Sequence, residues 1–312
     1  MAPSATDHGD DKHDGRGLEA ISDAVDMVNS LKFLAVDTIQ PPGGTQFDAE
    51  SRFDSAKDKM AFRQYQNACD RVSGLYVEQH AKQTVAHNLA ARQRFHSRMR
   101  VRPEMTVWEA MEKLDTLLDD SDPDTELSQI QHLLQSAEAI RRDGKPRWMQ
   151  LVGLIHDLGK LMFFLDGGVQ GQWDVVGDTF PVGCAFDRRC IFHEAFDANP
   201  DSHHEVYSTQ YGIYTPGCGL DNLIMSWGHD EYLYLVVREQ SRLPAEGLAM
   251  IRYHSFYPWH KDGAYRDFMA AGDEVLLNAV KAFNPYDLYS KSDGLPNVEE
   301  LKVSVSLGNT LP

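Results

Sequence analysis

The sequence predicts a mainly α-helical fold, and three observations support this prediction. Apolar residues recur at intervals of three and four, as in "FRQYQNACDRVSGLYVEQH", which is typical of amphipathic helices. Turn-forming and capping residues, such as those in "SDPDTE", separate these segments where helix ends are expected. The chain shows no internal repeat and no series of alternating strands. We therefore expect a single helical domain with glycine- and aromatic-rich loops.

The expected helices follow one another along the chain. They cover residues 57–100, 106–120, 126–144, 146–165, 220–240, 245–256 and 265–283. The third is closed by Gly144, with Arg141 and Arg142 in its last turn, where basic side chains complement the helix dipole. The stretch from Asp166 to about Asn199 is rich in glycine and aromatic residues, which predicts loops with short strands.

The N-terminal part of the chain differs from the rest. Residues 1–17 are polar and contain almost no large apolar side chain, so we expect a disordered tail. Residues 18–57 are a poorly defined extension. The single helical domain is expected to span residues 58–312.

Composition narrows the classes of function. A chain of 312 residues can bury a sizeable core, and its formal net charge of −17 argues against nucleic acid or an anionic membrane as a partner. The four cysteines have no CxxC spacing, which favours reduced thiols in a reducing compartment. The first residues lack the apolar core of a secretory signal, and no stretch of about 18 apolar residues could span a bilayer. We expect a cytoplasmic monomer.

Four of the thirteen histidines lie inside apolar helical stretches, one on each of four expected helices. They are His132, His156, His229 and His254. One such histidine is usually a satisfied core residue. Four of them favour a shared metal, because imidazole is a common metal ligand and bundled helices can direct one ligand each to the same point.

The segment "LVGLIHDLGK" (151–160) places His156, Asp157 and Lys160 in an otherwise apolar helix. Neighbouring helical residues differ by about 100° in direction, so His156 and Asp157 can reach one metal, or Asp157 can bridge two. Lys160 lies four residues after His156 and is expected to share its face. Burying Asp and Lys unpaired would cost several kcal/mol each, which a nearby cation would offset. A buried ion pair that caps the helix is the alternative. Gly159 is interpreted as allowing a close approach.

The His-Asp doublet, with an upstream histidine, a downstream histidine and a late aspartate, resembles the metal pattern of the HD-domain superfamily. Most of these proteins are phosphohydrolases. The resemblance implies an HD-domain-like helical bundle, and it supplies an alternative function, a metal-dependent phosphohydrolase acting on a nucleotide. A non-catalytic metal-containing sensor of a polyol or nucleotide is a third possibility.

Longer blocks resemble a narrower family, the myo-inositol oxygenases. The blocks run in family order and are "LDDSDPD", "LVGLIHDLGK", "VVGDTFPVGC", "CGLDNLIMSWGHDEYLY", "MIRYHSFYPWH" and "FNPYDLYSK". The resemblance implies a di-iron enzyme that opens myo-inositol with O₂ to give D-glucuronate and water, the first step of inositol catabolism. The reaction is a four-electron oxidation in which the substrate supplies every electron, so no NAD, flavin or haem is expected.

The resemblance also implies roles for individual residues. The metal ligands would be His132, His156, Asp157, His229, His254 and Asp287, with Asp157 as the bridging carboxylate. The substrate-binding residues would be Arg63, Asp119, Asp120, Ser121, Lys160, Gly177, Asp178, His254 and Ser255. Tyr76 and Lys291 would belong to a lid. Asp230 and Glu231 are interpreted as helix-surface carboxylates and His260 as a structural histidine. Pro285 is expected to break its helix, so that Asp287 is presented from a helix end.

The ligand set suits activation of a weakly acidic hydroxyl. One Fe(II) and one Fe(III) carry five positive charges, of which two aspartates neutralise two, so the centre would stay electropositive. This field is expected to lower the pKa of Lys160, which could then take the hydroxyl proton. Lys160 and Asp157 are accordingly the predicted catalytic residues.

Overall fold

The computed structural model describes residues 69–98, 103–122, 127–165 and 167–290, together with 63, 65, 297, 298, 301 and 302. All of them fall within one compact unit, Gly44–Pro312. The predicted tail, the predicted extension and the predicted lid residue Lys291 lie outside the described residues. The start of the helical domain at residue 58 stays a prediction.

The described part of the chain is mainly helical, as predicted. Its α-helices are α2 (Asp70–Lys82), α3 (Val85–Arg98), α4 (Val107–Leu114), α5 (Gln129–Arg142), α6 (Arg147–Ile155), α7 (Met162–Leu165), α8 (His229–Gln240), α9 (Ala245–Tyr253), α10 (Tyr257–His260) and α11 (Asp273–Tyr289). Short 3₁₀ helices include η4 (Leu158–Leu161) and η5 (Gln172–Asp174). Two antiparallel strands, β1 (Pro181–Val182) and β2 (Ile224–Met225), pair with Pro181 opposite Met225.

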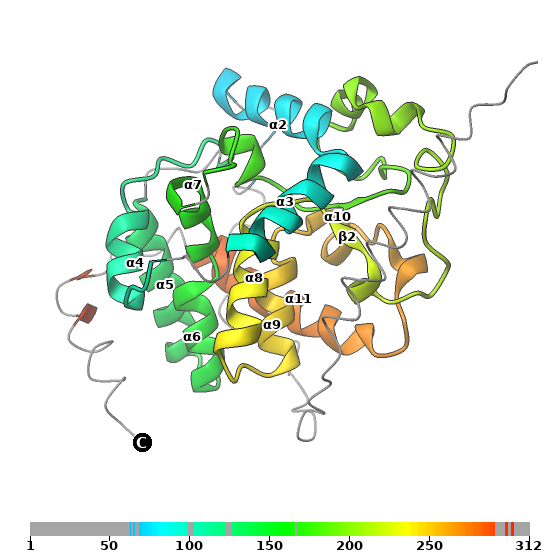
Figure 1. Cartoon of the computed structure of the whole chain (residues 1–312). Helices are drawn as coiled ribbons and strands as arrows, with labels where there is room; N and C mark the ends of the chain where they lie inside the picture. The colour runs from blue at the N-terminus through cyan, green and yellow to red at the C-terminus, as the bar shows by residue number, and fades with distance from the viewer. Residues whose placement is uncertain are drawn as a thin grey trace, which may run out of the picture. The chain divides into compact units, whose positions relative to one another are not determined.

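The helices pack as a bundle whose core lies between α5, α6, α9 and α11. In Figure 1, α5 lies beside α6 and α8 lies beside α9, and α11 also packs against α9. Fully buried side chains such as Leu133, Met149 and Phe283 join these helices in one apolar cluster. A second cluster, around Tyr76 and Phe95, holds α2 and α3 against the start of α8. Burial of these apolar surfaces is the main force that fixes the helix ends around the site.

Two glycines permit the close contacts that bring the site together. A Cβ on Gly153 would lie 2.7 Å from Cδ1 of Ile140, so α5 and α6 could not approach as closely. A Cβ on Gly159 would lie 2.0 Å from the backbone oxygen of His229, a contact that no side chain could tolerate. The predicted role of Gly159 is therefore confirmed, since it lets η4 lie directly against the start of α8.

Several predicted helix boundaries are wrong, because polar side chains end helices that periodicity alone would extend. Residues 57–100 were expected to form one helix, but the described part contains two, separated at Gln83 and Thr84. The Gln83 amide hydrogen-bonds both backbone groups of Trp227, at 2.7 and 3.1 Å, and Thr84 Oγ1 accepts the backbone N–H of His87. These bonds replace helical ones and turn the chain.

Other boundaries shift in ways that matter for the site. The helix expected over 146–165 ends at Ile155, and the chain continues as η4 and α7. The helix expected over 220–240 starts only at His229, after β2, and the one expected over 265–283 is α11. Pro285 does not break α11, which runs through it to Tyr289; the ring removes one N–H donor but leaves the last turn in place. The helices expected over 106–120 and 245–256 end at Leu114 and Tyr253.

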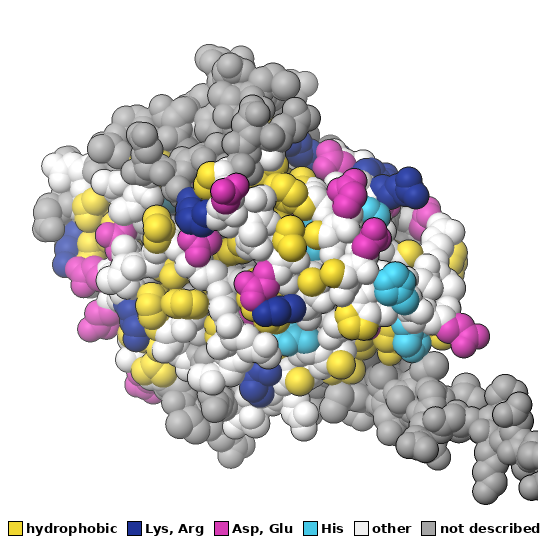
Figure 2. Space-filling model, turned by 90° about the horizontal axis from the view of Figure 1, so that it is seen from above, with side chains coloured by type: hydrophobic (Ala, Val, Ile, Leu, Met, Phe, Trp, Pro, Cys, Tyr) yellow, Lys and Arg dark blue, Asp and Glu magenta, His cyan; other side chains and the backbone are white. Residues whose placement is uncertain are grey.

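Charges on the surface are mixed. Figure 2 shows acidic and basic side chains of the described residues interspersed with apolar ones on the face seen from above. Scattered exposed apolar side chains of this kind are usual for globular proteins. Among the described helices, none combines the length and the apolar character that crossing a bilayer would need.

Candidate metal centre and active site

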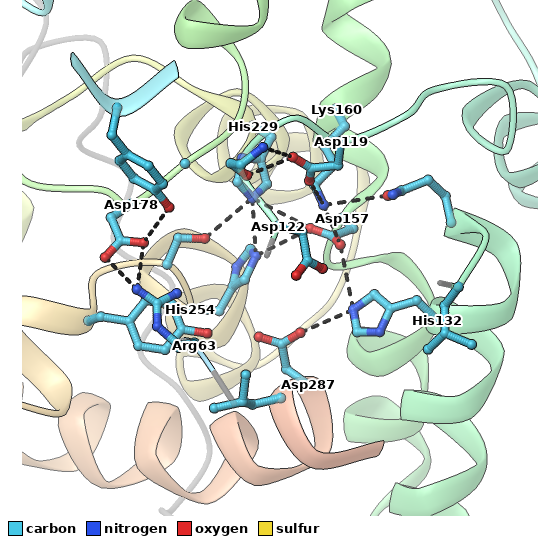
Figure 3. A pocket seen from close by; sticks show the side chains of 18 of the residues that line it. Arg63, Asp119, Asp122, His132, Asp157, Lys160, Asp178, His229, His254 and Asp287 are labelled. Atoms are coloured by element: carbon cyan, nitrogen blue, oxygen red, sulfur yellow. Dashed lines mark hydrogen bonds and ion pairs between the residues drawn. The ribbon is translucent and has the colours of Figure 1, made fainter. Parts of the chain in front are cut away.

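The six predicted metal ligands converge, and each lies close to the end of a helix. Their placement is His132 in the first turn of α5, His156 directly after α6, Asp157 directly before η4, His229 at the first position of α8, His254 directly after α9 and Asp287 in the last turn of α11. All six are buried. Figure 3 shows five of them around one cavity, with Asp157 in the middle.

The ligands form two groups that share Asp157. In the first group, Nε2 of His132 and of His156 lie 3.1 and 3.2 Å from Oδ1 of Asp287. In the second group, the Nε2 atoms of His229 and His254 lie 3.2 Å apart. Asp157 Oδ2 is 3.6 Å from both Nε2 atoms of the first group, and its Oδ1 is 3.5 Å from both of the second. This carboxylate therefore faces one group with each oxygen.

The hydrogen bonds of the histidines orient their rings for metal binding. Nδ1 of His156, His229 and His254 contacts the backbone oxygens of Gly153, Val175 and Ile251 at 3.0, 2.8 and 2.9 Å. A backbone oxygen only accepts, so each Nδ1 carries a proton and Nε2 of each ring points into the cluster. Nε2 of His229 and Nε2 of His254 lie close enough to share one proton, and a metal ion bound by both rings would replace that proton. Nε2 of His156 also makes no hydrogen bond of acceptable geometry with any described residue. The residues thus fit a pair of metal ions.

The carboxylates of the cluster stay ionised. Burial raises the pKa of Asp157 and Asp287, but neighbouring groups outweigh it and hold both values well below the usual range. The main neighbours are Lys160 for Asp157, and the rings of His132 and His156 for Asp287. Two carboxylates and four imidazoles are a ligand set suited to iron and similar transition metals.

Metal uptake should depend on pH through His254. Burial lowers the pKa of His254, but the nearby carboxylates of Asp230, Asp157 and Asp287 have the larger opposite effect. The pKa is therefore raised to about 9. At pH 7 a metal must therefore displace a proton from this ring, whereas near pH 9 it need not. We expect the apparent affinity of the metal-free protein for Co²⁺, followed by visible absorption, to rise up to about tenfold per pH unit between pH 6.5 and 8.5. An affinity for Co²⁺ that does not change over this pH range would contradict the role of His254 as a metal ligand.

Asp230 and Glu231 were predicted to be surface carboxylates, but both are buried, so this prediction is wrong. Oδ1 of Asp230 lies 2.7 Å from Nε2 of His229 and accepts the hydroxyl of Ser255 at 3.1 Å. Glu231 is buried between Arg92 and Arg252, at 3.2 and 2.7 Å. The apolar residues that surround "HDE" in the sequence were the available signal, because they left no solvent-facing side for the acids.

Lys160 is held by carboxylates on both sides. Its Nζ lies 2.8 Å from Asp119 Oδ2 and 2.8 Å from Asp157 Oδ2, and it donates to Gln129 at 3.4 Å. Burial lowers the pKa of Lys160, but the two carboxylates more than offset this, so the pKa is raised. The predicted lowering depends on the charge of bound metal ions and stays a prediction; it did not consider Asp119. Lys160 also faces Asp157 rather than His156, because the α-helix ends before it.

The cavity beside the cluster contains most of the predicted substrate-binding residues. It is lined by Arg63, Tyr65, Tyr76, Asp119, Ser121, Asp122, Leu127, Gln129, His132, Asp157, Lys160, Gly177, Asp178, His229, His254, Ser255, Tyr257, Asp287 and Leu288. The sequence did not single out Tyr65, Leu127, Gln129, Tyr257 or Leu288. Asp120 does not line the cavity; its carboxylate pairs with Arg71 at 3.0 Å on the partly exposed side of the loop.

One wall of the cavity is a network around Asp178. Nη2 of Arg63 donates to both oxygens of Asp178, at 2.8 and 2.7 Å, and the guanidinium lies 3.3 Å from the centre of the Tyr257 ring. Tyr76 donates to the same carboxylate at 3.1 Å, so this residue belongs to the wall, with its hydroxyl 3.2 Å from that of Tyr65. Gly177 has a φ of 100°, and a Cβ there would collide with the Gln79 amide.

Comparisons with known proteins agree with this geometry. The sequence profile of the family described as "Myo-inositol oxygenase" matches residues 69–306. The chain is 50% identical to "Inositol oxygenase 1" of Arabidopsis thaliana over 77% of this chain and 78% of the relative. It is 47% identical to "Inositol oxygenase" of Dictyostelium discoideum (80% of this chain, 87% of the relative) and 44% identical to that of Mus musculus (79% and 87%). The chain is an enzyme that belongs to the myo-inositol oxygenase family.

Proposed function

We propose that the protein cleaves the ring of myo-inositol with O₂ to give D-glucuronate and water, as the first step of inositol catabolism in the cytoplasm, and that it acts as a monomer. The observation that carries this proposal is the carboxylate of Asp157, whose two oxygens face two separate groups of histidines. Such a carboxylate can bridge two metal ions. Membership of the family and the names of its relatives support the substrate.

Two irons, one Fe(II) and one Fe(III), are the proposed cofactor. His132, His156 and Asp287 would hold one ion, His229 and His254 the other, and Asp157 both. When bound, the irons would supply Lewis acidity toward a hydroxyl and the redox chemistry of O₂. The second group offers fewer protein ligands from this set, so it leaves more room for a substrate oxygen.

The cavity suits a neutral polyol better than a phosphate ester. Among the described residues that line it, Arg63 and Lys160 are already neutralised, since Arg63 pairs with Asp178 and Lys160 pairs with Asp119 and Asp157. A phosphate would need unpaired basic side chains. Carboxylates, a serine hydroxyl and an amide instead offer many donors and acceptors for ring hydroxyls, and leaving them unpaired would reject an analogue with a misplaced hydroxyl. This disfavours the nucleotide phosphohydrolase.

Lys160 would control the proton of the reacting hydroxyl. Its ammonium group is a hydrogen-bond donor that lies between Asp157 and Asp119 (Figure 3). From this position it could hold a substrate oxygen against the cluster. Asp119, on its other side, accepts a hydrogen bond from Lys160 and keeps the ammonium group charged and in place. The pair thus supplies a donor and an acceptor without exposing either to bulk water.

Oxygen uptake by iron-loaded protein tests the proposal. With myo-inositol and a thiol reductant such as cysteine, we expect consumption of one O₂ for each D-glucuronate formed, and two irons per chain by elemental analysis. Phosphate release from nucleotides without oxygen uptake would support the phosphohydrolase instead. Ligand binding with neither product would indicate a sensor.

Replacing Arg63 by lysine should weaken substrate binding although the charge is kept. Lysine lacks the planar guanidinium, whose Nη2 contacts both oxygens of Asp178 while the plane stacks on Tyr257. We expect the KM for myo-inositol to rise about tenfold, as the loss of one charge-assisted contact implies. The matched control is Arg189→Lys, at an exposed pair with Asp187. A KM equal to that of the wild type would exclude Arg63 from the binding site.

A further inference from the structure

The segment Leu118–Ser121, named here the acidic loop, carries the aspartate that holds Lys160. Oδ2 of Asp119 contacts Lys160 at 2.8 Å, and its Oδ1 accepts the backbone N–H and the hydroxyl of Ser121 at 2.8 and 2.6 Å. Both oxygens of this carboxylate are therefore engaged inside the cavity. The position of Lys160 depends on how firmly the backbone of the acidic loop is held from outside.

The side chain of Gln172 holds that backbone on both sides of Asp119. Its Nε2 donates to the backbone oxygen of Leu118 at 2.8 Å, and its Oε1 accepts the backbone N–H of Asp120 at 2.9 Å. A primary amide has one donor end and one acceptor end, so it can satisfy both groups at once. Glutamate can satisfy only the N–H, and methionine, which has a similar length, neither.

The backbone of Gln172 belongs to a second element of the site. Its carbonyl accepts the N–H groups of Val175 and Val176, both at 2.9 Å. The carbonyl of Val175 in turn accepts the backbone N–H and Nδ1 of His229, both at 2.8 Å. The same short segment continues to Asp178 on the opposite cavity wall.

The residues that follow Gln172 fix this segment to the core. Trp173 and Asp174 are almost fully buried. Oδ1 of Asp174 lies 2.6 Å from Nε2 of His87 on α3, and the Trp173 ring packs 5.0 Å from the His87 ring. Gln172 thus extends from an anchored segment, so its amide can restrain the acidic loop instead of moving with it.

We propose that Gln172 is a positioning residue that sets the distance between the acidic loop and the segment 172–178, and thereby places Lys160 and Asp119 relative to His229. It touches neither substrate nor metal and acts through the backbone on either side of Asp119. The kinetic part of this inference rests on the proposed function; the structural part does not.

Hydrogen exchange of the Asp120 amide tests the structural part in the full-length protein. Gln172→Met should speed this exchange by about fivefold to tenfold, because one backbone bond of ordinary strength is lost. Gln172→Glu should leave the amide protected, since a carboxylate oxygen still accepts it. The matched control is Gln170→Met, because Gln170 is exposed and its hydrogen bond to Asp174 is made by the backbone N–H. Equal exchange in the wild type and Gln172→Met would overturn the inference, whatever reaction the enzyme performs.

Steady-state kinetics with myo-inositol tests the functional part. In both Gln172 variants we expect the KM to rise about fivefold to twentyfold, with an iron content per chain equal to that of the wild type. A merely structural role would lower the fraction of active, iron-loaded protein, and so kcat and iron content together, at an unchanged KM; this result would refute the positioning role. If the wild-type protein left myo-inositol unchanged, the proposed function would be refuted, but the hydrogen-exchange result would still stand.

Discussion

Asp157→Asn is expected to abolish activity and to reduce bound iron to less than one ion per chain. The amide has the same shape as the carboxylate, but it lacks the charge and the second strong acceptor that face the two histidine groups. Both metal positions lose a ligand through this one change, whereas loss of His229 would affect one position directly. Ligands to a shared ion act as a unit, so we expect the loss to be far greater than that of one hydrogen bond.

Elemental analysis and oxygen uptake measure this outcome together. The control is Asp267→Asn, which changes an exposed aspartate that accepts Gln210 at 3.1 Å, away from the cavity. The control should keep two irons and full turnover. If the Asp157 variant kept two irons, Asp157 could not be the bridging ligand.

Lys160→Met should lower kcat by about a hundredfold to ten-thousandfold, the usual contribution of a positioned proton-transfer group. Methionine fills much of the same volume but cannot donate to a substrate oxygen, and it leaves the carboxylates of Asp119 and Asp157 without the cation between them. Because Lys160 is not a metal ligand, iron should stay bound.

The measurement is single-turnover product formation at saturating myo-inositol, with the iron content determined on the same sample. Lys82→Met provides the comparison, since Lys82 is exposed and its ion pair with Glu78 lies on the surface. An undiminished rate in the Lys160 variant would refute the proton role, whereas loss of iron would show that Lys160 mainly supports the metal site.

The sequence was sufficient to predict the class of fold and the convergence of the six candidate metal ligands. Histidines inside apolar helical stretches were expected to point into the shared interior of the bundle. The doublet His156-Asp157 indicated which carboxylate would lie at the centre. Helix ends were less predictable, because they depend on contacts between distant segments. Gln83 ends α2 by bonding Trp227, 144 positions away, and no local pattern reveals that partner.

The electrostatic surroundings of the site were hard to predict for the same reason. The predicted pKa of Lys160 considered the charge of the cluster but not Asp119, which reaches it from a loop 41 positions earlier in the chain. The placement of Asp230 was misjudged because a carboxylate on a helix usually faces water. Gln172 carried no signal at all in the sequence, since a glutamine in a glycine-rich loop is ordinary and its importance lies only in the two backbone groups that it meets.

The wide separation of the ligands along the chain has a consequence for folding. His132 and Asp287, which would share one ion, stand 155 positions apart, and Asp157 would connect that ion to the group that contains His229. Bound metal would therefore act as a cross-link that closes very long loops, and it would remove much of the freedom that those loops have in the unfolded polypeptide. In this fold the catalytic ions would serve the same purpose that disulfide bonds serve in secreted proteins.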